Sequence, residues 1–394
     1  MDRVDVAVVG GGVAGSLAAL MLGRAGYRVC LIDPVRPRGT EFRCEKLEHA
    51  HVQALQQARL ADEILPGTLR YEGIWIGRHG KLAERRNVVE FGIDYAGLVN
   101  RLHQLLPDRV SVLDDKVIEA DIVGRSMHRR LHLAGGGQID ARLVVLATGS
   151  NADALATFGY TQRMVRRCHS ISIGFDLVPG NTRLANLGAL TWFGERPRDR
   201  IAYLTIFPLA GRLRANLFVY RQTDDTWLRE FRARPSAVLA DSLPGFTRTI
   251  GTLDISGPIR FRSMDLVDTE AKPQPGVVLV GDAFGTACPA SGTGASKAMI
   301  DVERLCNIHV PRWLGSDAVG PSQIAAFYGD REKQLSDRHS RKVSLFARRI
   351  ALEEGGLWTA LRWARAAASR SRRLLPRTND HAGQLAEVPT SATH

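Results

Sequence analysis

The sequence has no long apolar run and few aromatic residues. Of its 394 residues, 44% are hydrophobic and 7% aromatic, and no run reaches the roughly 18 uncharged apolar residues that a membrane-spanning helix needs. A chain of this length and hydrophobic content can bury a large core in two or three domains. Neither a basic segment nor a cleavable apolar segment precedes the first apolar run. We therefore expect a globular cytoplasmic protein.

Cysteine is also scarce. The cysteines are spread along the chain, and no two of them have the Cys-x-x-Cys spacing. They are Cys30, Cys44, Cys168, Cys288 and Cys306. An odd number of scattered cysteines indicates neither a disulfide framework nor a zinc site.

Positive charge is concentrated near one end of the chain. The formal net charge is +12, and residues 331–377 contain 13 Lys and Arg residues but only 4 acidic residues. The remainder is close to neutral, which argues against a nucleic-acid groove across the main body. Apolar residues interleave with the cations, as in an amphipathic helix. We expect this segment to pack one face on the body, with peripheral contact to an anionic membrane as the alternative.

The first 33 residues carry the most specific pattern. A largely apolar run, Val4–Val9, enters a glycine-rich segment and a helical stretch, and a second apolar run, Val29–Ile32, ends at Asp33. Strand, glycine turn, helix, strand and acid in this order predict a dinucleotide-binding βαβ unit. The residues expected to bind the cofactor here are Gly10, Gly12, Val13, Ala14, Gly15 and Asp33.

Each of these residue types has a physical task. Gly10 permits a turn that a Cβ would obstruct, Gly12 lets the backbone approach a pyrophosphate, and Gly15 lets the helix lie close to the strand. Asp33 follows Gly10 by 23 residues and is placed to accept hydrogen bonds from an adenosine ribose. Its carboxylate would repel a 2′-phosphate, so the unit predicts FAD or NAD rather than NADP.

Later patterns predict an α/β protein. Leu143–Ala147 and Gly276–Val280 suit buried strands of a parallel sheet. Residues 165–265 contain the strand-like runs Ser170–Leu177, Ile201–Pro208 and Leu213–Tyr220, separated by Gly, Pro and Asn, as in an antiparallel sheet. Val52–Leu65 is predicted to be one helix, and residues 71–91 short strands with a turn at 78–80.

These patterns also suggest domain boundaries. We expect a nucleotide-binding domain at 1–70, 94–160 and 270–320, a substrate domain at 71–93 and 161–269, a basic helical region at 321–380, and a disordered tail at 381–394.

A second motif lies in residues 280–294. Val-Gly-Asp-Ala-Phe at 280–284 is followed by Pro289, by Ser-Gly-Thr-Gly at 291–294, and by a predicted helix that contains Asp301. Together with the βαβ unit, this segment resembles the FAD-dependent class A flavoprotein monooxygenases of the p-hydroxybenzoate hydroxylase (PHBH) fold, over about residues 1–310. The resemblance implies an FAD-binding Rossmann-like domain of the GR2/PHBH type, an inserted antiparallel substrate domain and a helical C-terminus.

The resemblance also implies roles for individual residues. Asp282 would hydrogen-bond the ribityl chain of FAD, the turn 289–294 would direct N–H groups at the N1/C2=O edge of the flavin, and Arg43 would lie near the cofactor. The further cofactor residues implied in this way are Arg43, Gly281, Asp282, Pro289, Gly292, Thr293 and Gly294.

The sequence departs from the family at two places. The strand that normally leads into an Asp-Gly pair ends here in Thr-Gly-Ser at 148–150, and Tyr95 stands where the family commonly has an arginine. No second G-x-G-x-x-G follows a strand. Electrons are therefore expected either from NAD(P)H that binds transiently or from a partner flavin reductase.

The implied activity is that of a monooxygenase, which inserts one oxygen atom from O2 into an aromatic or polyketide-like small molecule through a flavin C4a-hydroperoxide. Such chemistry needs a dry pocket, and aromatic residues of the antiparallel segment are candidates for its walls. They are Phe175, Trp192, Phe193, Phe207, Phe218 and Tyr220. No general base stands out, and His51 and His169 are candidates only because they flank expected cofactor segments.

Other readings share the same motifs. A flavin reductase of the geranylgeranyl-reductase type would move hydride without O2, and a flavin-binding protein without turnover would also keep both motifs. Lys46 suggests a flavin halogenase, but the Trp-x-Trp-x-Ile-Pro segment of those enzymes is absent. Cys44 and Cys288 flank the expected flavin segments, and we expect them to be packing residues rather than a redox pair or flavin link.

Overall fold

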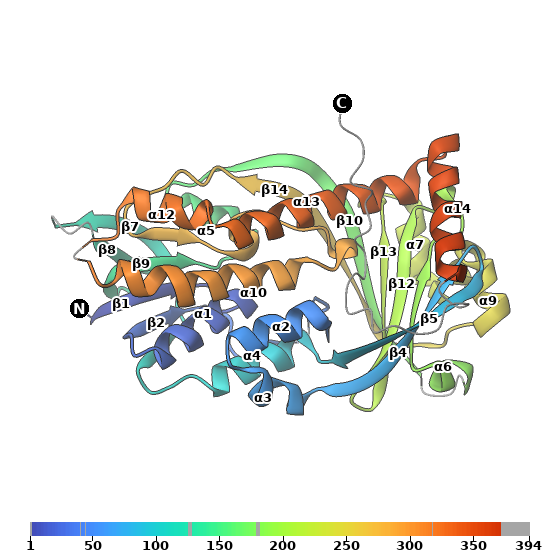
Figure 1. The fold of residues 1–394 in the computed structure, drawn as a ribbon, viewed down its shortest axis with the longest axis horizontal. Helices are drawn as coiled ribbons and strands as arrows, with labels where there is room; N and C mark the ends of the chain where they lie inside the picture. Colours follow the sequence, from blue (N-terminus) through green and yellow to red (C-terminus); the bar gives the residue numbers. More distant parts are fainter. Residues whose placement is uncertain are drawn as a thin grey trace.

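Two β-sheets organise the computed structural model, which describes residues 2–39, 41–43, 45–124, 128–178, 182–316 and 318–371 (Figure 1). The first sheet has the strand order β6-β2-β1-β9-β8-β7, with β15 paired to β9. Its strands are β1 (Asp2–Val9), β2 (Val29–Ile32), β6 (Val110–Leu113), β7 (Val117–Val123), β8 (His128–Leu133), β9 (Gln138–Leu146) and β15 (Val277–Leu279). The pairs among β6, β2, β1, β9 and β15 are parallel, as the apolar runs predict.

Helices cover one face of this parallel sheet. α1, α2, α4 and α10 share an apolar core with the strands, and the β7–β8 hairpin and α5 cover the opposite face. The helices are α1 (Val13–Arg24), α2 (His49–Gln57), α3 (Ala61–Ile64), α4 (Tyr95–Gln104), α5 (Ala152–Ala156), α10 (Gly294–Arg304) and α11 (Val310–Trp313). Burial on both faces explains why β2, β15 and the carboxyl-terminal halves of β1 and β9 lack charged residues.

The second sheet is mainly antiparallel and curls beside the first (Figure 1). Its order is β14-β10-β13-β12-β11-β4-β5-β3. The strands are β3 (Lys46–Leu47), β4 (Leu69–Arg78), β5 (Lys81–Gly92), β10 (Gln162–Leu177), β11 (Ala189–Phe193), β12 (Ile201–Leu209), β13 (Arg212–Val219) and β14 (Ile255–Thr269). The expected α/β fold with an antiparallel sheet is thus confirmed.

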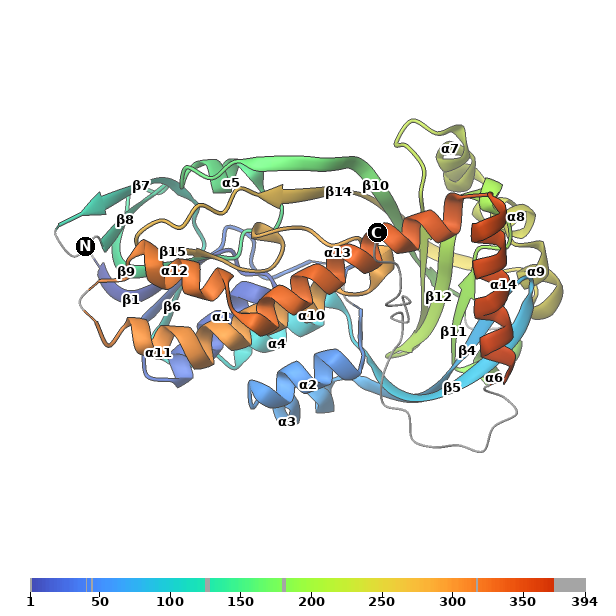
Figure 2. The same ribbon diagram turned by 45° about the horizontal axis from the view of Figure 1, so that its top comes forward.

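Alternation along its strands gives this sheet two different faces. One face packs against α7 (Thr226–Ala233), α8 (Pro235–Ser242) and α9 (Pro244–Ile250), and α6 (Thr182–Leu187) lies at the same end of the molecule (Figure 2). Trp192 belongs to this packed face, whereas the neighbouring Phe193 points to the opposite side. Successive side chains of a strand point to opposite faces, so adjacent aromatic residues cannot share one wall.

Strands β10 and β14 form a long paired ribbon that spans both sheets (Figure 2). Their pairing extends from Gln162 opposite Thr269 to Leu177 opposite Ile255. The first half of β10 has mostly exposed side chains, without the apolar alternation by which a strand is recognised in sequence. For this reason the sequence predicted a strand only from Ser170 onwards.

Two other local predictions were wrong in extent. The single helix expected over 52–65 is divided into α2 and α3, and α2 begins at His49, where the Glu48 and His51 side chains form a capping box. Residues 69–92 form two long strands rather than several short ones, and the expected turn at 78–80 joins them.

The basic C-terminal region is helical as far as it is described. It contains α12 (Pro321–Tyr328), α13 (Arg331–Leu352) and α14 (Gly356–Ser371). α13 lies beside α10 in both views and continues to the second sheet, where α14 packs against the β4–β5 turn through stacked His79 and Trp363 rings (Figures 1 and 2). Among the described residues, no helix is long and apolar enough to cross a membrane. The tail expected at 381–394 lies outside them.

Replacing Gly77 by alanine should destabilise the second sheet. A Cβ at this position would lie 2.0 Å from Cε3 of Trp192, which is fully buried on the neighbouring strand. We expect the free energy of unfolding to fall by about 1–3 kcal/mol, measured by urea denaturation followed by tryptophan fluorescence. Gly67→Ala is the control, because a Cβ there meets no atom within 4 Å. Equal midpoints for the two variants would contradict this account.

Candidate cofactor and substrate site

A cavity of about 520 Å³ lies between the two sheets. One wall is formed by the carboxyl ends of β1, β2, β9 and β15, and the other by the unpacked face of the second sheet. The carboxyl ends of parallel strands are where ligands bind in open α/β sheets. Of the thirteen residues expected to bind the cofactor, those that line the cavity are Gly10, Gly12, Val13, Ala14, Asp33, Arg43, Asp282, Pro289, Gly292 and Gly294.

The glycine turn after β1 depends on two of its glycines for packing. Gly10 has a φ of +102°, and a Cβ on Gly15 would lie 1.8 Å from the Gly10 carbonyl oxygen. Gly15 is therefore needed for the close approach of α1 to the strand, although it lies behind the cavity wall. Gly12 is the N-cap of α1, so the free N–H groups of this helix face the cavity.

Asp33 stands at the carboxyl end of β2 and is almost fully buried. Its Oδ2 accepts a hydrogen bond of 2.5 Å from the Arg38 guanidinium, and its Oδ1 accepts one from the Val35 N–H. Arg38 also lines the cavity. Sequence reasoning missed Arg38 because nothing in the pattern after β2 distinguishes it from the other arginines of that segment.

The second motif forms two turns on the opposite side of the cavity. Gly281–Ala283 is a short 3-10 turn that presents Asp282 to the cavity, and Pro289–Ser291 is another that leads through Gly292 into the N-terminus of α10. Burial raises the pKa of Asp282, and the positive charges of Lys297 and Arg262 partly offset this effect. The predicted helix after the motif is confirmed, with its first residue, Gly294, at the cavity wall.

Three further side chains lie between these two sets of turns. The Arg43 guanidinium lies 5.2 Å from the centre of the Tyr95 ring, and it forms an ion pair with Glu41. A Cβ on Gly12 would lie 3.0 Å from the Tyr95 hydroxyl, so Tyr95 reaches from Arg43 to the glycine turn. Arg262 of β14 joins this group from the second sheet. Arg262 could not be recognised from the sequence, because only the sheet topology brings β14 here.

The remainder of the cavity is walled mainly by apolar and aromatic side chains. Three of the six aromatic residues expected in the walls are there, namely Phe193, Phe207 and Phe218. The other three, Phe175, Trp192 and Tyr220, belong instead to packed cores. Strand alternation turns Phe175 and Trp192 towards α7–α9 rather than towards the cavity.

A cluster of buried charges forms one side of this apolar space. The Lys46 ammonium contacts Glu48 at 2.7 Å and Glu90 at 3.1 Å, and the Tyr71 hydroxyl donates to Glu90 at 2.8 Å. Burial alone would lower the pKa of Lys46, but Glu48 and Glu90 outweigh it and hold that pKa well above its usual value. Lys46 therefore remains charged and engaged by two carboxylates.

His51 lines the cavity beside this cluster and is held in one tautomer. Its Nδ1 accepts a hydrogen bond of 3.0 Å from the Glu48 N–H, and burial lowers the pKa of its imidazole. The ring is thus neutral, and Nε2 carries the proton. Among the described residues, Nε2 has no hydrogen-bond partner. His51 can therefore donate a hydrogen bond to a ligand, whereas the general-base role considered from sequence would need the Nδ1 contact to break.

His169 and the four described cysteines take no part in the cavity wall. His169 is fully buried, its Nε2 lies 3.3 Å from the Ser344 carbonyl oxygen, and burial together with Arg348 lowers its pKa to about 4. The Cys288 Sγ contacts the Ser170 hydroxyl in a buried position. Cys44 lies outside the described residues, within which no group of His, Cys, Asp and Glu is arranged to hold a metal ion.

A buried ion pair fixes the segment between Asp33 and α2 to the second sheet. Arg214 of β13 contacts both Glu45 and Asp176, and Asn216 donates to the Glu45 carboxylate at 2.9 Å. The Arg214 guanidinium also lies 4.1 Å from the centre of the Phe42 ring. Burial lowers the pKa of Arg214 to about 10, so it is charged at neutral pH.

Replacing Arg214 by methionine should be strongly destabilising. Glu45 is only about 1% exposed as a side chain, and an unpaired buried carboxylate costs about 3–5 kcal/mol of unfolding free energy. The matched control is Arg24→Met, which breaks a half-exposed pair with Glu63 and should cost less than about 1 kcal/mol. Guanidinium denaturation of both variants measures the difference, and equal losses would refute the importance assigned to the Glu45–Arg214 pair.

Comparison with known proteins agrees with this geometry. A family model described as an FAD binding domain matches residues 3–309. The chain is 24% identical over 335 residues to 3-demethoxyubiquinol 3-hydroxylase of Escherichia coli K12, which covers 78% of this chain and 79% of that protein.

Solved structures share the fold over nearly the whole chain. p-Nitrophenol 4-monooxygenase PnpA of Pseudomonas putida DLL-E4 aligns with a TM-score of 0.77 at 16% identity, over 95% of this chain and 97% of that one. PqsL of Pseudomonas aeruginosa aligns with a TM-score of 0.69 at 17% identity, over 93% and 100%. The resemblance to the PHBH fold is thereby confirmed, and the chain belongs to the FAD-binding-domain family of FAD-dependent monooxygenases.

Proposed function

We propose that this protein transfers one oxygen atom from O2 to an aromatic or polyketide-like small molecule, with FAD as its cofactor. The observation that carries the proposal is that one cavity is lined both by the turns expected to hold a flavin and by an apolar, aromatic wall. Relatives of similar fold include enzymes named for p-nitrophenol and for 2-methyl-3-hydroxypyridine-5-carboxylic acid. An aromatic substrate of comparable size is consistent with this cavity.

The residues present fit FAD. The backbone around Gly10 and Gly15 leaves no room for a Cβ, and the free N–H groups of α1 and α10 both face the cavity, where they favour pyrophosphate and flavin oxygens. In this assignment Asp33 holds the adenosine ribose, with Arg38 fixing its carboxylate, and Asp282 accepts hydrogen bonds from the ribityl chain. Arg43 and Arg262 supply positive charge between these groups.

Bound FAD supplies the redox chemistry with O2, and the protein's own residues exclude water and orient the substrate. Phe193, Phe207 and Phe218 give the substrate side an apolar wall in which peroxide release by stray water is suppressed. The N-terminus of α10 favours negative charge on the nearby edge of a reduced flavin. The Nε2–H of His51 supplies a hydrogen bond to an oxygen atom of the substrate.

The geometry disfavours the halogenase alternative. Both carboxylates of Glu48 and Glu90 engage Lys46, whereas handling of hypohalous acid needs a lysine that faces the reagent. A flavin reductase acting without O2 would use the same cofactor turns, so experiment must separate it from a monooxygenase. The electron donor is likewise open between NAD(P)H and a partner flavin reductase.

Oxygen uptake tests the proposed reaction. With FAD-loaded protein and NADH or NADPH, we expect 4-nitrophenol or a related phenol to stimulate O2 consumption. Fewer than one molecule of hydrogen peroxide should be released for each molecule of O2 consumed. If neither nucleotide reduces the flavin, the flavin is reduced by light instead. Oxygenation of the substrate by this photoreduced protein would then indicate that a partner reductase is the electron donor. Anaerobic reduction of a C=C substrate would instead support the reductase, and protein that binds no FAD would refute the proposal altogether.

Substitution of His51 should weaken binding of phenols rather than remove a titrating base. His51→Phe should raise the Kd of 4-nitrophenol about tenfold, since one lost hydrogen bond is worth about 1–1.5 kcal/mol, and His51→Gln should keep most of the affinity. Because burial lowers the pKa of His51, its donor form persists above neutral pH. With 4-methylphenol, which unlike 4-nitrophenol stays un-ionised there, the effect should be constant from pH 7 to about pH 9. Nitrobenzene, which lacks the hydroxyl, is the control ligand, and an equal loss for both ligands would contradict the hydrogen bond.

A further inference from the structure

Helix α13 lies outside the matched family region, which ends at residue 309, and none of its residues lines the cavity between the sheets. Its buried face nevertheless contacts both turns of the second motif. The residues that make these contacts are Lys333, Asp337, Ser340 and Ser344. Their spacing of four, three and four residues places them on one face of the helix, where a globular protein usually has apolar side chains.

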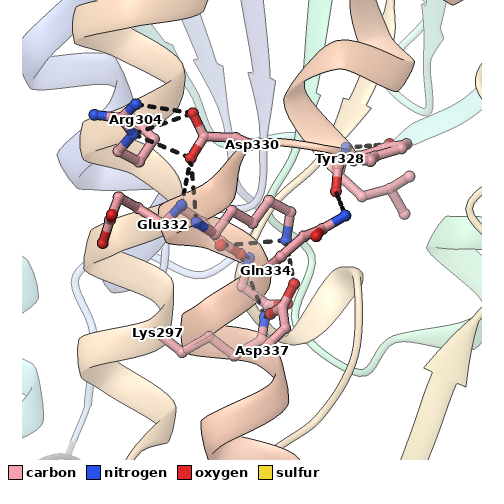
Figure 3. Close-up of polar contacts among 11 residues, drawn as sticks. Lys297, Arg304, Tyr328, Asp330, Glu332, Gln334 and Asp337 are labelled. Atoms are coloured by element: carbon pink, nitrogen blue, oxygen red, sulfur yellow. Dashed lines mark hydrogen bonds and ion pairs between the residues drawn. The ribbon is translucent and has the colours of Figure 1, made fainter.

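The first turn is reached through a network of four charged residues, of which Lys297 and Asp337 are labelled in Figure 3. The Lys333 ammonium contacts Asp301 at 3.2 Å and Asp337 at 2.9 Å, and the Lys297 ammonium contacts the same two carboxylates at 3.3 and 3.1 Å. Lys333 and Asp301 are fully buried, and Lys297 is nearly so. Two cations and two anions thus balance one another between α10 and α13.

This network holds the backbone of the turn that presents Asp282. The Gly281 N–H donates to Asp301 at 2.8 Å, and the Gly281 carbonyl accepts from Lys297 at 3.0 Å. The Lys333 ammonium lies 3.6 Å from the centre of the Phe284 ring, which is the first residue after the turn. Both ends of the turn are therefore fixed by charged side chains.

The second turn is held by two serines of the same helix face. The Ser340 hydroxyl lies 2.8 Å from the Thr293 hydroxyl, and the Ser344 hydroxyl accepts a hydrogen bond of 3.0 Å from the Cys288 N–H. Cys288 and Thr293 flank the segment that leads into the N-terminus of α10. The conformation of this segment therefore also depends on α13.

We propose that the buried polar face of α13 positions the two turns that hold FAD, so that Lys333, Asp337, Ser340 and Ser344 are positioning residues of the cofactor site. The proposal rests on the proposed function in taking these turns to hold FAD. The charge balance of the network predicts an electrostatic effect on the site. Loss of Lys333 would leave one surplus negative charge beside the turn Gly281–Ala283, which already presents the buried carboxyl group of Asp282.

The pH dependence of FAD binding by a Lys333 variant distinguishes a positioning role of α13 from a role in packing alone. Lys333→Met should weaken FAD binding about tenfold or more, measured by quenching of flavin fluorescence when FAD is titrated into deflavinated protein. The defect should shrink as pH falls, because Lys333 is one of the two cations that lower the pKa of Asp337, and protonation of the Asp337 carboxylate in the variant removes the surplus charge. The other charged or titratable groups near the cluster are Asp282, Asp268, Tyr328, Arg338, Arg341 and the exposed Lys342.

Two companion variants make the test specific. Lys333→Met with Asp337→Asn restores the charge balance and should recover part of the affinity, whereas Lys342→Met removes the same charge from the exposed side of the helix and should change the Kd less than twofold. If Lys333→Met does not fold, Ser344→Ala replaces it, with a severalfold loss of affinity expected.

The possible failures are distinguishable. Wild-type protein that binds no FAD would overturn the proposed function. Wild-type protein that binds FAD, together with a Lys333→Met or Ser344→Ala Kd equal to that of Lys342→Met, would overturn the role of α13. A defect of Lys333→Met that is independent of pH and not relieved by Asp337→Asn would also overturn it, because a loss of packing alone has those properties.

Discussion

The ion pair between Glu45 and Arg214 is the contact on which the cavity depends. It joins the segment that follows β2 to the inner face of the second sheet, and the same segment carries Arg43, Lys46 and the start of α2. A buried pair of this kind gives limited net stability, since desolvation consumes much of the attraction. The pair matters chiefly for geometry. Because neither charge can be left buried without the other, the pair fixes the position of the segment after β2 relative to the second sheet.

Paired opposite charges also fix segments at other points around the cavity. Charged residues form the cluster of Lys46 with Glu48 and Glu90, the pair of Asp33 with Arg38, and the network between α10 and α13. The Asp33–Arg38 pair and the network between α10 and α13 contain equal numbers of cations and anions, whereas the Lys46 cluster has one cation for two carboxylates. The apolar wall borders only the Lys46 cluster, which gives one region suited to a charged dinucleotide and another suited to a ring with a polar substituent.

Sequence reasoning succeeded where the chemistry is local. The turn at Gly10–Gly15 and the segment 281–294 could be predicted because each is defined by the spacing of neighbouring residues. The sides taken by Trp192 and Phe193 were also predictable in principle, since adjacent residues of a strand face opposite ways. Arg262 and Lys333 could not be predicted, because strand pairing and helix packing bring them to the site from distant parts of the chain. The first half of β10 was missed because its exposed arginines show no alternation.

The β10–β14 ribbon limits how the two sheets can move. Their backbone pairing runs from Gln162 to Leu177 with three register shifts: between Met164 and Arg166, between Arg166 and Ser170, where Cys168 has a φ of +41°, and between Gly174 and Asp176. Hydrogen-bonded strands resist sliding along one another, whereas an irregular step in the ladder bends more easily. Relative movement of the two sheets is therefore constrained by this ladder, and any bend in it should be concentrated at its three irregular steps.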